Sequence, residues 1–97
     1  MQRTTEARNA IGPLLDQLIV QLDAEGCATQ RAYFARIRRS LYHARHDIEL
    51  ATPIMELSTS AVVGFQFSND ADVLISRILE KAEQLADELE YAWPTFH

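Results

Sequence analysis

Residues 31–51 read RAYFARIRRSLYHARHDIELA, and this stretch carries the pattern that decides the fold. Apolar side chains recur in it at gaps of three and four residues, which places them on one stripe of an α-helix and suits packing along a second helix. The stripe consists of Phe34, Ile37, Leu41, Ala44, Ile48 and Ala51. The segment therefore predicts a long amphipathic helix.

Charged residues follow the same helical period. Arg31, Arg38 and Arg45 repeat every seven residues beside the apolar stripe. A second row faces outward on roughly the opposite side of the helix and consists of Arg36, Arg39, His43 and His46. Two ordered basic rows indicate that this helix contacts acidic groups, either within the fold or in a partner.

Apolar stripes on both sides of this stretch predict two more helices. The first runs from about Thr4 to Glu25 and stops at Gly26, and Pro13 predicts either a kink or a later helix start. The last begins at Ser68 or Asn69 and ends before Pro94. This helix is predicted to be central, because four further apolar residues widen its seam: Leu74, Leu79, Ala86 and Trp93. The seam itself consists of Ala71, Ile75, Ile78, Ala82, Leu85, Leu89 and Ala92.

The middle helix is predicted to start with Thr29 as its cap and to bend or break at Thr52-Pro53. The spacing continues beyond the proline, which favours a kinked continuation to about Val63; the residues concerned are Met55, Ser58, Val62 and Phe65. Residues 63–67 are predicted to form a loop that buries two phenylalanines. The expected fold is an all-α antiparallel bundle of three long helices with the middle one kinked or broken at Pro53, giving three to four segments.

Composition is consistent with one small helical domain. The chain has 97 residues, of which 47% are hydrophobic and 24% charged, with three glycines and three prolines. Its single cysteine, Cys27, cannot form an internal disulfide, and the sequence contains neither a readable secretory signal nor a membrane-spanning apolar run. A cytoplasmic protein without a membrane association is expected.

The net charge of −5 is unevenly distributed. Residues 27–46 contain five arginines and no acidic residue, whereas residues 68–97 contain seven acidic residues against Arg77 and Lys81. A uniformly basic chain would indicate nucleic-acid binding. This division instead favours contacts between basic and acidic helices.

No catalytic or cofactor site is predicted. His43, His46 and Asp47 are the only residues with metal-ligand chemistry close together, and they are too few for a zinc or di-iron site without further ligands. Ser58, Thr59 and Ser60 match no nucleophile motif. The protein is expected to have no enzymatic activity and to require no metal or cofactor.

Binding of another protein is the predicted function, in the manner of a regulator, adaptor, chaperone or inhibitor. The predicted partner surface consists of Arg36, Arg39, Tyr42, His43, His46 and Leu50. Self-association as a two-fold homodimer is predicted through Ile19, Val20, Arg31, Arg38 and Arg45. Nucleic acid or another phosphate ligand on the arginine-rich helix is the alternative, which the acidic remainder of the chain disfavours.

Overall fold

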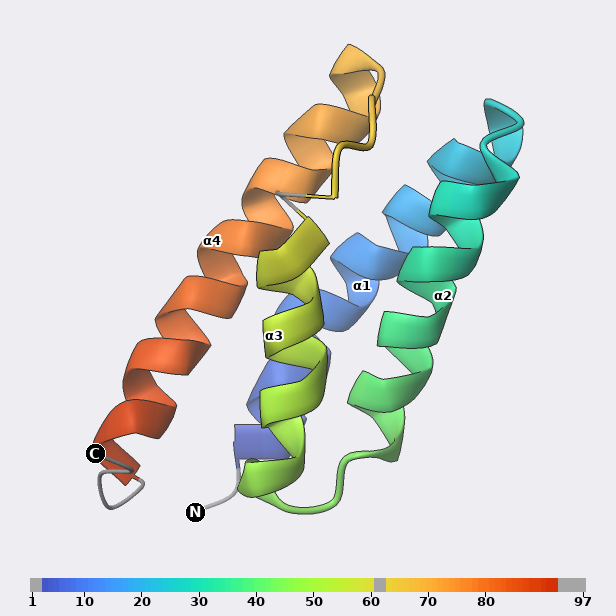
Figure 1. Ribbon diagram of the computed structural model, residues 1–97. Coiled ribbons are helices and arrows are strands. Elements are labelled where there is room, and N and C mark those ends of the chain that lie inside the picture. Colours follow the sequence, from blue (N-terminus) through green and yellow to red (C-terminus); the bar gives the residue numbers. More distant parts are fainter. Residues whose placement is uncertain (1–2, 61–62, 93–97) are drawn as a thin grey trace.

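The computed structural model describes residues 3–60 and 63–92, in which every regular element is helical and no strand occurs (Figure 1). The elements in chain order are α1 (Arg3–Ala24), α2 (Ala28–His43), the 3₁₀ helix η1 (Asp47–Leu50), α3 (Ala51–Ser60) and α4 (Asn69–Ala92). The predicted all-α class is confirmed.

The helices pack as a bundle in which α1 makes the most extensive contacts. It packs against both α2 and α4, while the shorter α3 contacts α2 and α4. Figure 1 shows α3 in front of α1, between α2 and α4, with successive helices running in opposite directions. The prediction that the last helix is central is therefore wrong. Helix α1 is the central helix instead, because its long apolar face is deeply buried.

The predicted apolar stripes form one core. The α1 side chains Ile11, Leu15, Leu18 and Leu22 are fully buried, as is Ile37 of α2. The seam of α4 is buried as predicted wherever its side chains are described, which covers Ala71, Ile75, Ile78, Ala82, Leu85 and Leu89. Each large side chain in this set contributes roughly 1.5–3 kcal/mol by leaving water.

Helix α1 continues through Gly12 and Pro13, so the alternative start at Pro13 is wrong. Pro13 lies on the exposed side of the helix, where water can bind the carbonyl group left without an amide donor one turn earlier. Gly26 ends the helix as predicted, with a positive φ of 73°. The amides of Cys27 and Gly26 donate to the carbonyls of Leu22 and Asp23 at 2.9 and 3.1 Å, which is a Schellman motif.

Helix α2 starts two residues earlier than predicted and ends much earlier. Cys27 occupies the N-cap position, so Thr29 lies within the first turn and is not the cap. The helix stops at His43, and residues 44–46 are irregular. The predicted break at Thr52-Pro53 is therefore wrong. Pro53 lies in the first turn of α3, where its missing amide breaks no helical hydrogen bond.

This earlier break changes which residues of the next segment face the core. Ile48 and Met55, predicted on the buried stripe, are 62% and 67% exposed. Leu50, Ile54 and Leu57 are buried in their place. The irregular residues 44–46 interrupt the helical period, so a stripe extrapolated from α2 points in the wrong direction in α3.

The predicted loop before α4 is confirmed for the described residues 63–68. Phe65 and Phe67 are half-buried and pack against α2, with ring centroids 5.3 Å from Tyr33 and 6.0 Å from Phe34, respectively. Ser68 then caps α4, because its hydroxyl accepts a hydrogen bond from the amide of Ala71 at 3.2 Å. The predictions for Val62, Trp93 and Pro94 lie outside the described residues. No helix in the described part is long and apolar enough to span a membrane.

Candidate functional site

The predicted outward basic row is only partly retained on α2. Arg36, Arg39 and His43 are exposed on this helix, at gaps of three and four residues. His46 is exposed as well, but it follows the end of the helix. The row is therefore a three-residue surface of α2, with His46 on a separate segment.

The segment after α2 is held by hydrogen bonds from two elements, α1 and η1. Arg8 of α1 donates from its guanidinium to the carbonyl of Ala44 at 2.6 Å. The carboxylate of Glu49 accepts from the amides of Arg45 and His46, each at 3.0 Å. These amide hydrogen bonds lower the pKa of Glu49 below its ordinary value. They also give the irregular backbone the partners that a longer helix would have supplied.

Asp47 is a capping residue of α1. Its carboxylate accepts the backbone amide of Arg3 at 2.6 Å, which satisfies a free donor at the first turn of α1. His43 is the last residue of α2, so the predicted helical adjacency of His43 and Asp47 does not exist. No group of three or more potential metal ligands occurs among the described residues.

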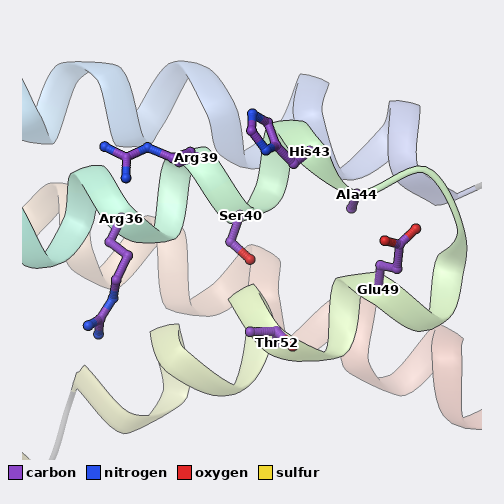
Figure 2. Close-up of a pocket in the computed structure, with 7 residues that line it drawn as sticks. All are labelled: Arg36, Arg39, Ser40, His43, Ala44, Glu49 and Thr52. Atoms are coloured by element: carbon purple, nitrogen blue, oxygen red, sulfur yellow. The ribbon is translucent and has the colours of Figure 1, made fainter.

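A first depression of about 420 Å³ lies between α2 and the η1–α3 segment (Figure 2). Its lining residues are Arg36, Arg39, Ser40, His43, Ala44, Glu49 and Thr52. Figure 2 shows Arg36 leaning towards α3, whereas Arg39 and His43 lie on the other side of α2. Arg36 pairs with Glu56 of α3 at 3.0 Å. The basic groups diverge, so the depression does not concentrate positive charge on one bound anion.

A second depression of about 510 Å³ lies between α1 and α2, and we call it the α1–α2 groove. Its lining residues are Asp16, Ile19, Val20, Ala35, Arg38, Arg39, Tyr42 and His43. Val20 is 69% exposed and Tyr42 is 38% exposed. The groove thus combines apolar groups from both helices with the basic groups of α2.

Two arginines predicted at a dimer edge are paired within the chain. Arg38 forms an ion pair with Asp16, and its guanidinium stacks 4.6 Å from the centre of the Tyr42 ring. Arg31 pairs with Asp23 at 3.3 Å. Their acidic partners lie on α1, and Arg36 pairs with α3. Among the described residues, no ion pair of the kind that the charge distribution suggested joins the basic helix to the acidic last helix.

The structure brings together two sets of residues that were predicted separately. Tyr42, Arg39 and His43 from the partner set share the α1–α2 groove with Ile19, Val20 and Arg38 from the dimer set. Asp16 and Ala35 complete it and were not predicted. The sequence did contain a signal for Ala35: it lies seven residues before Tyr42, and residues at this interval share a helix face.

Leu50 is not part of any exposed surface. Its side chain has no exposed area and belongs to the core, so its predicted role as a surface anchor is wrong. Arg45 and His46 are exposed but lie outside the groove.

Comparison with known proteins does not extend this description. No protein-family model, curated protein or solved structure matches the chain.

Proposed function

We propose that this is a non-catalytic helical protein that acts by binding another protein, and that the α1–α2 groove receives this partner. The observation that carries the proposal is the presence of Val20 and Tyr42, both exposed, in the same depression as Arg39 and His43. Protein interfaces are enriched in aromatic residues and arginine, and a few large anchors supply most of their binding energy.

The same observation favours a protein over a nucleic acid. A phosphate backbone needs a continuous row of free cations and gains little from apolar groups. Arg36 forms an ion pair with Glu56, and Arg38 forms one with Asp16. Among the described residues, Arg39 is therefore the arginine of this surface that takes part in no ion pair. A protein partner can use both the apolar walls of the groove and this remaining charge.

The proposal includes self-association and a cytoplasmic location. Exposed apolar side chains occur on more than one helix, which supports a second contact surface besides the groove. The single cysteine, which cannot pair within the chain, supports a reducing compartment.

The partner proposal is tested by affinity capture from the native lysate with and without nuclease. The tested variant is Val20→Glu/Tyr42→Ala, which places a charge in the groove and removes its aromatic wall. Met55→Glu, at an equally exposed apolar position on α3, is the matched control. We expect the wild type and Met55→Glu to capture a discrete protein that they retain after nuclease treatment. The groove variant is expected to lose this protein.

Two results would contradict the proposal. Capture of nuclease-sensitive material alone, with affinity falling steeply as salt rises, would establish nucleic-acid binding instead. Equal retention of the partner by the groove variant and the wild type would place the binding surface elsewhere. Far-ultraviolet circular dichroism of both variants confirms that the comparison is between folded proteins.

A further inference from the structure

We propose that the partner segment in the α1–α2 groove is an amphipathic α-helix that carries two carboxylate side chains, three or four residues apart, along one edge of its apolar stripe. The inference rests on the proposed function, because it assigns a chemistry to the partner of that same groove. The backbone of the groove walls, their apolar side chains and their free charge each restrict what can bind there.

Both walls of the groove are helices, and this restricts the backbone of the occupant. The lining residues belong to α1 and α2, and residues 16–20 and 35–39 lie inside these helices. Their amides and carbonyls are already paired along the helix, so the walls offer no backbone partner to an extended segment. A helix satisfies its own backbone groups and packs its side chains between the ridges of neighbouring helices. The occupant is therefore a helix that lies along the groove.

The apolar side chains of the groove require a matching apolar stripe on this helix. Val20 and Tyr42 are exposed on opposite walls, and the half-buried Ile19 and Ala35 line the same groove. The side chain of Ala35 ends at its Cβ atom, so a neighbouring helix can approach α2 closely there. Large aliphatic side chains at gaps of three and four residues on the bound helix cover these groups, which is the usual mode of helix binding in a groove.

The free charge of the groove is positive. Asp16 and Arg38 form an ion pair, so their charges cancel. Arg39 and His43 are exposed, and neither takes part in an ion pair among the described residues. Figure 2 shows both side chains on the side of α2 away from α3, and both line the groove. Charge complementarity therefore selects a partner with acidic groups beside its apolar stripe.

The spacing of Arg39 and His43 sets the spacing of the partner's carboxylates. Four residues of an α-helix rise about 6 Å along its axis. Two carboxylates three or four residues apart on a helix aligned with α2 therefore lie at a matching separation. Arginine binds a carboxylate through two parallel hydrogen bonds, and the imidazole donates one. A lysine or arginine in place of a carboxylate would face the Arg39 guanidinium, and such like-charge contacts exclude wrong partners.

The test first identifies the segment that lies in the groove. Cys27→Ser removes the single native thiol, and Ala24→Cys places a new one at an exposed position of α1, four residues beyond Val20. A benzophenone attached to this thiol cross-links a helix that passes the end of the groove in native lysate, and mass spectrometry gives the sequence of the cross-linked segment. The same label on Met55→Cys, in α3, is the control. We expect the label at position 24, and not the control, to capture an amphipathic segment with the paired carboxylates.

A synthetic peptide of the cross-linked segment then tests charge and conformation by fluorescence anisotropy. Arg39→Glu is expected to weaken peptide binding by about tenfold or more, whereas Arg77→Glu, at an exposed position of α4 outside the groove, is expected to leave it unchanged. A peptide with lysine in place of both carboxylate residues is expected to bind Arg39→Glu more tightly than the wild type. A proline at a solvent-facing position in the middle of the peptide is expected to weaken binding by about tenfold or more, because it breaks a helix.

The outcomes separate this inference from the proposed function. A partner that Val20→Glu/Tyr42→Ala retains overturns both, as does a cross-link to a second copy of this chain. If that variant loses the partner, three results overturn this inference alone. They are the absence of a cross-link at position 24, a segment without the paired carboxylates, and equal peptide binding by Arg39→Glu and Arg77→Glu. Undiminished binding of the proline peptide overturns the helical conformation in the same way.

Discussion

The phenol oxygen of Tyr42 lies against the backbone of Gly12: a Cβ atom added at Gly12 would be 2.3 Å from it. This distance is far below van der Waals contact, so only glycine allows the Tyr42 ring to occupy its present place. The ring in turn stacks with Arg38 and forms one wall of the α1–α2 groove. A glycine in the middle of a helix, next to a proline, is therefore explained by a side chain from another helix.

Gly12→Ala tests this relationship through an energetic coupling. Alanine in a helix is more stable than glycine by about 1 kcal/mol, but here its Cβ displaces the Tyr42 ring. We expect little net change in the free energy of unfolding in the wild-type background. In a Tyr42→Ala background, the same substitution is expected to stabilise by about 1 kcal/mol. Urea unfolding of the four proteins measures the difference, and additive effects would show that the contact does not form.

Leu50 and Ile48 form a matched pair that tests the position of the helix break. Leu50→Ala is expected to cost about 2–5 kcal/mol because the side chain is fully buried. Ile48→Ala, two residues earlier and exposed, is expected to change the free energy of unfolding by no more than about 0.5 kcal/mol. The predicted continuous helix gives the opposite ranking. Chemical denaturation of the two variants decides between the two registers.

Ser68→Ala tests the start of α4. The Ser68 hydroxyl accepts from the Ala71 amide at 3.2 Å and lies 2.5 Å from a carboxylate oxygen of Glu25. Loss of an N-cap side chain is expected to destabilise the protein by about 1 kcal/mol. Ser76→Ala, at an exposed position within α4, is the control and is expected to be neutral or slightly stabilising. Equal effects of the two substitutions would contradict the capping role.

Glu49 gives a prediction for acid stability. Amide hydrogen bonds from Arg45 and His46 lower its pKa in the folded state below the ordinary value of 4.5. The carboxylate therefore contributes stability that is present above pH 4.5 and is lost as the pH falls through the lower, folded-state pKa. Glu49→Gln is expected to remove this part of the pH dependence. Thermal unfolding across the acid range measures it, and an unchanged acid profile would argue against the hydrogen bonds.

Local sequence patterns determined the helical class, the end of the first helix and the start of the last one. These features depend on interactions within a few residues, such as the positive φ of Gly26, the Ser68 cap and the three-four spacing of Leu15, Leu18 and Leu22. A helix signals its own stripe and ends because its hydrogen bonds are local. The same holds for the loop that presents Phe65 and Phe67.

Contacts between helices decided where α2 ends, which residues of the next segment are buried and where the α1–α2 groove forms. The chain leaves α2 at residues 44–46 because Arg8 and Glu49 bind its free backbone groups there, and neither interaction has a signature within α2 itself. That break buried Leu50 and exposed Met55, reversing what periodicity predicts. The α1–α2 groove likewise depends on Val20 and Tyr42 meeting across two helices. The periodicity of a helix can be read from its sequence. The rotation of one helix against another is set only when its side chains pack on a neighbour, as the Tyr42 ring packs on the backbone of Gly12.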